Sequence, residues 1–339
     1  MKLSRFALAA VLAAGALVLS GCVAGEKAPD AESGAGSEAS VLNIDFATYN
    51  PLSLIIKEKG WLESDLAADD VKVNWIQSAG SNKANAALLA GALDVGSTAG
   101  SAALLNRANG SPIEAIVVAN KPEWAALVVG ADSPITDVAQ LKGKKIAATQ
   151  GTDPYFFLLQ SLEEAGLSAE DVTIENLQHA DGWSALQGGS VDAWAGLDPI
   201  MGTAVTDGAR FLYRNVDFNT YDIVAATEDF LTKSPKLAQS VANAYADARV
   251  WALANPEETA SILAEAGGLT PEVATQVITD RTNFDIDPVP GAAQKSVLTT
   301  VGPIFVEIDS VDTQDKVDTA LKGLFNATFA QNAVTTDRK

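Results

Sequence analysis

Short apolar runs alternate with longer amphipathic stretches along most of the chain after Ser40. The runs 41–48 and 71–77 are typical of buried strands, whereas 51–64 has the spacing of a helix with one apolar face. Strands and helices that alternate in this way predict an α/β fold with largely parallel sheets. Because the same pattern starts again after Lys144, we expect two lobes.

Two strand-like runs, 123–135 and 221–231, are expected to carry the chain between the lobes as hinge crossings. Lobe 1 is then expected to comprise residues 41–128 together with 224–330, and lobe 2 residues 129–223. The C-terminal part is predicted to be helical, because a capping residue precedes a proline three times, at Ser234-Pro235, Asn255-Pro256 and Thr270-Pro271. The spacing of Asn255 and Glu258 predicts a capping box.

A secretion signal is predicted at the N-terminus. Two basic residues precede an apolar run at 6–19, which at roughly 14 residues is short for a membrane span of about 20. Leu19-Ser20-Gly21-Cys22 resembles the lipobox of bacterial lipoproteins, which implies lipidation of Cys22, the chain's only cysteine, and removal of 1–21. Residues 22–40 have almost no large apolar side chains and predict a flexible tether. A plain signal peptide or a short anchor helix is the alternative.

The charge of the chain argues against nucleic acid as a partner. Without residues 1–21 the chain keeps 43 acidic and 21 basic side chains, a formal charge of −22, and no basic stretch offsets it. The sequence also lacks H-E-x-x-H, a Cys/His cluster, a P-loop ending and a G-x-S-x-G elbow, so we expect no metal, no cofactor and no catalytic residues. His179, the only histidine, is expected to lie in a loop.

Small polar residues stand where two predicted helices begin. Gly96 to Ser101 includes Ser97 and Thr98 and leads into a helix of lobe 1, and Gly151-Thr152 stands at a corresponding place in lobe 2. If the lobes face each other, both helix N-termini point into one cleft and could hold an anion without lysine or arginine. An ordinary capped helix start is the alternative at each place.

Further candidates lie beside turns and crossings. Trp194 could form a cleft wall or belong to the core, and Asp198 could cap a helix or contact a ligand. Arg281 is expected to pair with Asp280 at the surface. Three aromatic residues could stack on the apolar part of a ligand, namely Tyr49, Trp124 and Tyr221.

Several segments, in one order, resemble the solute-binding lipoproteins of ABC importers for aliphatic sulfonates, taurine and nitrate, which are related to thiamine-pyrimidine binders. The strongest are SLIIKEKGWLE, ALLAGALDVGSTAGSAAL, DSPITDVAQLKGKKIAATQGT and ARVWALANPEETASILA. The resemblance implies a two-lobe fold like the type II periplasmic binding proteins, which closes over a ligand. It implies that a permease and an ATPase are the partners. It also implies that the protein is a monomer located outside the cytoplasm, in the cell envelope. It places the pocket on Tyr49 and Asn50, on Ser97, Thr98 and Ser101, on Gly151 and Thr152, and on Trp194 and Asp198.

Asp153-Pro154 departs from the sulfonate-type pattern, in which small or neutral residues follow the glycine. Asp153 therefore either caps its helix or disfavours a simple anion, and with Asp198 and Asp222 it suggests a zwitterion, an amine or a heterocycle. The expected function is capture of a small organic solute, sulfonate-like or taurine-like, for an ABC importer. A pyrimidine-precursor enzyme of the same fold and a ligand-sensing receptor domain are the alternatives.

Overall fold

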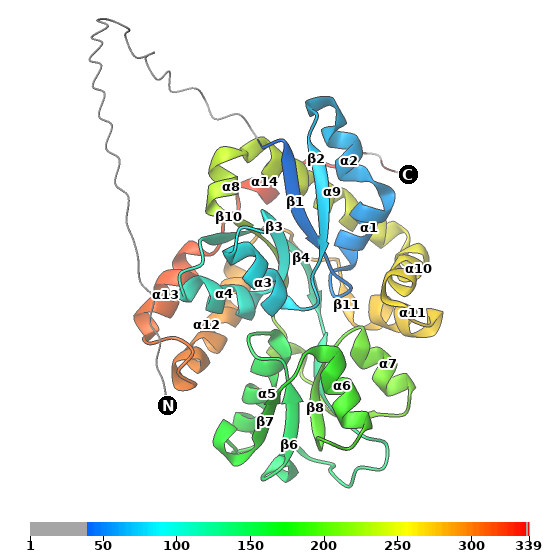
Figure 1. The fold of residues 1–339 in the computed structure, drawn as a ribbon, viewed down its shortest axis with the longest axis vertical. Helices are drawn as coiled ribbons and strands as arrows, with labels where there is room; N and C mark the ends of the chain where they lie inside the picture. Colours follow the sequence, from blue (N-terminus) through cyan, green and yellow to red (C-terminus); the bar gives the residue numbers. More distant parts are fainter. Residues whose placement is uncertain (1–38, 337, 339) are drawn as a thin grey trace, which may run out of the picture. The chain divides into compact units, whose positions relative to one another are not determined.

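The computed structural model describes residues 39–336 and residue 338, so the predicted signal peptide, Cys22 and most of the predicted tether lie outside the described part. Two β-sheets organise the described residues (Figure 1). The first has six strands in the order β11-β4-β10-β3-β1-β2, and the second has five in the order β7-β6-β8-β5-β9. We call the parts built around them lobe 1 and lobe 2.

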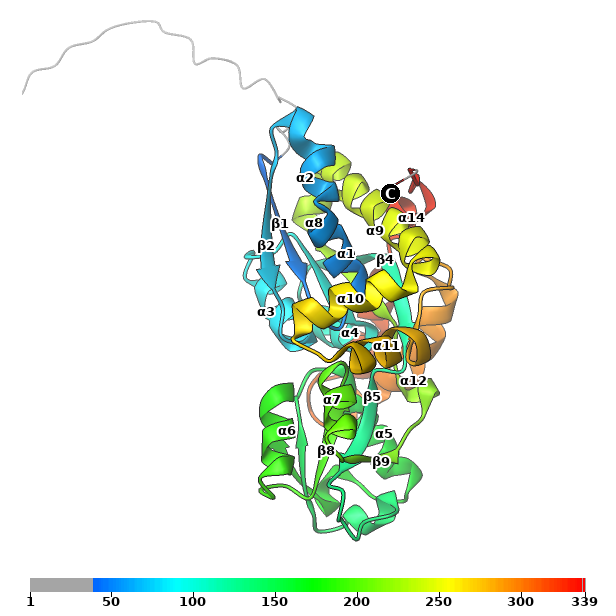
Figure 2. The same cartoon turned by 90° about the vertical axis from the view of Figure 1, so that its right-hand side faces the viewer.

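The strands of lobe 1 are β1 (Val41–Phe46), β2 (Lys72–Gln77), β3 (Val95–Ala99), β4 (Ile113–Pro122), β10 (Asp222–Thr227) and β11 (Thr282–Asn283). Its helices are α1 (Pro51–Lys59), α2 (Trp61–Leu66), α3 (Ser81–Leu89), α4 (Gly100–Ala108), α8 (Glu228–Lys233), α9 (Pro235–Ala254), α10 (Pro256–Gly267), α11 (Pro271–Asp280), α12 (Ala292–Glu307), α13 (Gln314–Gly323) and α14 (Thr328–Gln331). Figure 2 shows α9, α10 and α11 on one side of this lobe.

The strands of lobe 2 are β5 (Ala125–Val129), β6 (Lys145–Ala148), β7 (Thr173–Asn176), β8 (Ala193–Leu197) and β9 (Arg210–Tyr213). Its helices are α5 (Asp153–Glu164), α6 (His179–Gln187) and α7 (Ile200–Thr206). The predicted α/β architecture with a helical C-terminal part is therefore confirmed, although both sheets are mixed.

Both strands that enter a sheet from the other lobe run antiparallel to their neighbours. β5 runs antiparallel to β8 and β9, and β10 runs antiparallel to β3 and β4, whereas β1, β2 and β3 are mutually parallel. The chain thus crosses between the sheets after β4 and again before β10. Because β5 pairs within the second sheet, the first change from one sheet to the other falls at Glu123 and Trp124.

Local sequence signals explain several helix ends. Gly60, with φ of 62°, divides the single predicted helix at 51–64 into α1 and α2, since glycine readily adopts this left-handed conformation. Helices α9, α10 and α11 start at the three predicted prolines. The predicted capping box is wrong: the Asn255 amide donates to the carbonyl of Trp251, and Glu258 pairs with Lys59 at 2.6 Å.

The central strands are buried on both faces. Every residue of β3, β5 and β8 is buried, and their small and β-branched side chains pack beneath the covering helices. None of the helices among the described residues has the length and apolar character needed to cross a bilayer.

Candidate ligand-binding cleft

Loops from both lobes enclose a cleft of about 510 Å³. On the lobe 1 side it is bounded by the loop after β1, the loop between β2 and α3, and the loop between α10 and α11. On the lobe 2 side it is bounded by the start of α6 and by the end of β8 with the start of α7. The lining residues are Thr48, Tyr49, Gln77, Ser78, Ala79, Lys83, Gln178, His179, Ala180, Leu197, Asp198, Pro199, Ile200, Thr203, Ala266, Gly267, Gly268 and Leu269.

The charged side chains of the cleft are few. Lys83, on the first turn of α3, is exposed, and no described residue forms a hydrogen bond or an ion pair with its ammonium group. Asp198 lines the opposite wall, where its carboxylate is bound by Arg281. Among the described lining residues, Lys83 is therefore the one charge that no neighbouring group neutralises.

Asp198 and Arg281 form a buried ion pair that joins the two lobes. Arg281 Nε lies 2.5 Å from Oδ2 of Asp198, and the N–H of Gly202 donates to Oδ1 of Asp198 at 3.0 Å. Burial raises the pKa of Asp198, and the Arg281 charge and hydrogen bond act in the opposite direction. The expected surface pair of Arg281 with Asp280 is wrong, because the arginine at the end of α11 turns inward, where the buried carboxylate needs a counter-charge.

His179 is not a loop residue as expected. It begins α6 and is only 2% exposed. The hydroxyl of Thr149 donates to the carbonyl of Leu177 at 2.7 Å. The Thr149 oxygen therefore accepts a hydrogen bond from Nδ1–H of His179 at 3.2 Å. Burial lowers the pKa of His179 to about 4, which makes the imidazole neutral near pH 7. The ring therefore adds shape to the cleft without adding charge.

Tyr49 is a fixed part of the cleft wall. Its hydroxyl donates to the carbonyl of Ser97 at 3.0 Å, and its ring meets that of Trp124 edge to face, with the centroids 6.0 Å apart. Burial raises the pKa of Tyr49 well above its usual range. The side chain is thus neutral and rigid.

The polar start of α4 holds a carboxylate of the protein itself. Asp153, the first residue of α5, accepts hydrogen bonds from the Ser101 hydroxyl at 2.6 Å and from Trp124 Nε1 at 2.7 Å. The N–H and hydroxyl of Thr220 each donate to it at 2.7 Å. Of the helix start that was predicted to bind an anion, the Ser101 hydroxyl contacts Asp153, whereas the N–H groups of Gly100 and Ser101 donate to the Tyr221 carbonyl and the Thr220 hydroxyl. Neither Ser101 nor Asp153 lines the cleft.

The structure assigns internal contacts to the other predicted site residues. Asn50 caps α1, and Ser97 donates to the carboxylate of Asp45 from both its N–H and its hydroxyl. Trp194 is a core residue, 1% exposed. None of the following lines the cleft: Asn50, Ser97, Thr98, Ser101, Trp124, Gly151, Thr152, Asp153, Trp194 and Tyr221. Tyr49 and Asp198 are the two predicted residues that do.

The sequence analysis missed most of the lining. The segment 78–82 follows β2, where a strand-end argument places a ligand, so Lys83 one residue later could have been noticed as the only cation nearby. His179 similarly starts the helix that follows β7. The α10–α11 loop carries no such signal, because it reaches the cleft only through helix packing.

A second concavity, of about 530 Å³, lies on lobe 1 beside α4 and α13. Three of its four charged lining groups are already paired: Arg107 contacts Glu228 at 2.8 Å, and Lys316 forms an ion pair with Asp312. Within the described residues no group of three or more His, Cys, Asp or Glu side chains is placed to hold a metal ion.

Comparison with known proteins identifies the family to which the chain belongs. Residues 53–259 match the family model described as NMT1/THI5 like. An aliphatic sulfonates-binding protein of Escherichia coli (strain K12) is 31% identical over 221 residues, 64% of this chain and 69% of that protein. The alkanesulfonate-binding protein SsuA from Xanthomonas axonopodis pv. citri, solved with MOPS bound, is 25% identical with a TM-score of 0.75, over 84% of this chain and 98% of its own.

The same fold also occurs in an enzyme. The desulfurization enzyme DSZB has a TM-score of 0.62 at 17% identity, over 86% of this chain and 98% of its own, which is a likeness of fold alone. The family model, in contrast, covers well over half of the chain. This chain therefore belongs to the NMT1/THI5-like family of ABC substrate-binding proteins, has their two-lobe fold, and is related to aliphatic sulfonate-binding proteins.

Proposed function

We propose that this protein captures a small organic monoanion, of the alkanesulfonate type, in the cleft between its lobes and delivers it to an ABC importer. The observation that carries the proposal is the charge arrangement of the cleft. Lys83 has no ionic partner, Asp198 is neutralised by Arg281, and His179 is uncharged near pH 7. A ligand with one negative charge balances this arrangement.

The shape and polarity of the cleft support the same ligand class. Helices α3 and α6 both begin at its wall, and the N–H groups of a first helical turn favour an anion. Leu197, Ile200 and Leu269 offer an apolar surface for an alkyl part. The names of the relatives, which refer to sulfonates, agree with this chemistry.

The carboxylates that suggested an amine are already engaged. Asp153 is held by Ser101, Trp124 and Thr220, and Asp198 is held by Arg281. Asp222 is fully buried outside the cleft lining and accepts from Asn120 at 2.9 Å. A ligand ammonium group would have to compete with these contacts, which makes a simple anion the better fit.

The proposal includes the envelope location and the partners that the sequence suggested. Lipid on Cys22 would anchor the chain to the membrane, the segment after it would act as a tether, and a permease with its ATPase would receive the ligand. The two-lobe division, with 41–128 and 224–330 against 129–223, is proposed as the unit that opens and closes. A sensor role would use the same cleft but needs no permease.

Thermal unfolding tests the proposal directly. The chain from residue 22, with Cys22→Ser, is refolded to remove bound ligand and melted with butanesulfonate, taurine, nitrate, aminopyrimidines and alkylamines. A ligand at about 100 times its dissociation constant adds roughly 2.7 kcal/mol, which raises the melting temperature by several degrees. We expect the alkanesulfonate to give the largest shift. A shift with amines or aminopyrimidines alone would contradict the proposed ligand class.

A further inference from the structure

Arg281 stands behind the cleft rather than in it. It is 9% exposed and absent from the cleft lining, yet its guanidinium binds Asp198, which does line the cleft. The contact uses Nε at 2.5 Å from Oδ2 and Nη2 at 3.5 Å from Oδ1. The charge that a ligand meets at this wall is therefore decided by a residue that the ligand does not touch.

One short segment holds both members of the pair. The N–H of Asp198 donates to the carbonyl of Trp124 at 2.9 Å, and the carbonyl of Arg281 accepts from the N–H of Glu123 at 2.7 Å. These neighbouring residues form the first crossing between the lobes. Arg281 is further secured where β11 pairs with the end of β4. The crossing thus aligns a carboxylate of lobe 2 with a guanidinium of lobe 1.

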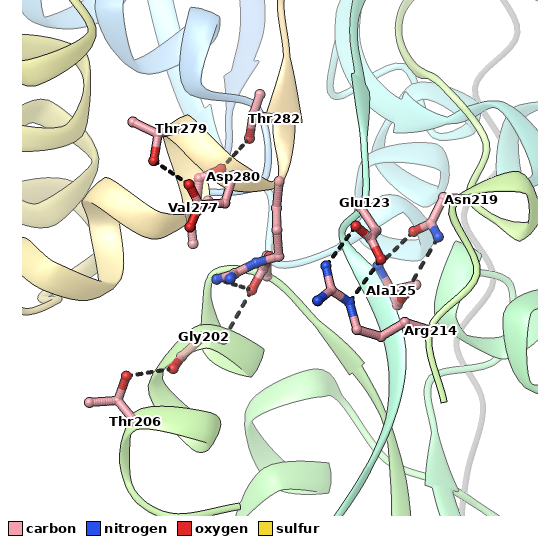
Figure 3. A network of polar contacts seen from close by, with 12 residues as sticks. Glu123, Ala125, Gly202, Thr206, Arg214, Asn219, Val277, Thr279, Asp280 and Thr282 are labelled. Atoms are coloured by element: carbon pink, nitrogen blue, oxygen red, sulfur yellow. Dashed lines mark hydrogen bonds and ion pairs between the residues drawn. The ribbon is translucent and has the colours of Figure 1, made fainter. Parts of the chain in front are cut away.

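The nearby charges do not replace Arg281. Arg214 is the other cation that acts on Asp198, and both its Nε and its Nη2 are bound by the Glu123 carboxylate, at 2.8 Å and 2.7 Å (Figure 3). Without Arg281, Asp198 would face the cleft with no direct ionic partner.

We infer that Arg281 is a specificity-determining residue, which makes the cleft selective for anions by cancelling the charge of Asp198. The inference rests on the proposed function, because it assigns the charge preference of that same cleft. It predicts opposite effects for the two single substitutions. At a pH at which Asp198 stays ionised, loss of Arg281 leaves a negative charge on the wall, and loss of the Asp198 charge leaves a positive one.

The test is calorimetric titration of butanesulfonate and its neutral analogue butanesulfonamide into three variants in the Cys22→Ser background. Arg281→Gln should weaken butanesulfonate binding about tenfold or more, and Asp198→Asn should strengthen it several-fold, since a single unscreened charge on the wall of a cleft acts on this scale. The double variant, which carries no net charge at the pair, should bind within about threefold of the wild-type protein. Binding of the sulfonamide should change much less in all three.

The outcomes separate this inference from the proposed function. If both single variants weaken the anion and the sulfonamide alike, the pair only holds the lobes together, and the inference is wrong. If the wild-type protein binds no anion, the proposed function fails and the inference fails with it. Should Arg281→Gln not fold, Asp198→Asn still decides, because a gain in butanesulfonate binding that butanesulfonamide does not share comes from charge and not from a change in how the lobes are held.

Discussion

The carboxylate of Asp153 lies 2.6 Å from the hydroxyl of Ser101, although the two residues start helices on different sheets. The polar stretch Gly96–Ser101 has the composition of an anion cradle, and in the folded chain the hydroxyl of Ser101, its last residue, binds the anionic carboxylate of Asp153. That anion comes from the chain itself. The small residues therefore contribute to the joint between the lobes, and the ligand is left to a neighbouring cleft with different residues.

Asp153→Ala should destabilise the protein by about 3–5 kcal/mol, because it leaves four buried donors without an acceptor. Asp137 is the matched control: its exposed carboxylate accepts one helix-capping bond, and Asp137→Ala should cost about 1 kcal/mol. Denaturant unfolding measures both. Formate should partly restore the Asp153→Ala variant by occupying the vacated cradle, and equal losses for the two variants would contradict this role.

Acid should destabilise the protein partly through His179. Its pKa is about 4 in the folded chain and about 6.5 in the unfolded chain, so the unfolded chain binds more protons between these values. Stability is thus lost as the pH falls from about 6.5 to 4. Between pH 7 and pH 4.5 the free energy of unfolding should fall by up to about 3 kcal/mol less in His179→Gln than in the wild-type protein. Denaturant unfolding of both proteins at both pH values measures this. A difference that does not vary with pH would show that the ring titrates normally.

Asp45 should make the protein less stable as the pH rises, which is opposite to the effect of His179. Burial raises its pKa to about 7, against the hydrogen bonds from Ser78 and Ser97, so the folded chain retains a proton that the unfolded chain loses above about pH 4. Its contribution is complete below the unfolded pKa and is lost as the pH rises toward 7. Asp45→Asn should therefore gain stability relative to the wild-type protein between pH 4.5 and pH 8, by up to about 3 kcal/mol. A constant difference over this range would refute the assignment.

The sequence predicted the architecture better than the site because the two depend on different kinds of information. Periodicity and proline caps are local, and they located β1, β2, α9, α10 and α11. The partner of a polar side chain is not local. Arg281 and Asp198 are 83 residues apart, and Ser101 and Asp153 are 52 apart, so neither pairing is visible in the pattern around each residue. Arguments from helix starts therefore found the joint between the lobes rather than the cleft.

The most direct test of the central claim, that the cleft binds an organic anion beside Lys83, is a titration of butanesulfonate into three proteins: wild type, Lys83→Gln and Lys322→Gln. Both lysines are exposed, and Lys322 lies on α13 outside the cleft, so it controls for the loss of one positive charge. We predict that Lys83→Gln weakens binding about tenfold with little change in melting temperature, whereas Lys322→Gln binds as the wild-type protein does. Equal affinity in all three proteins would contradict the claim.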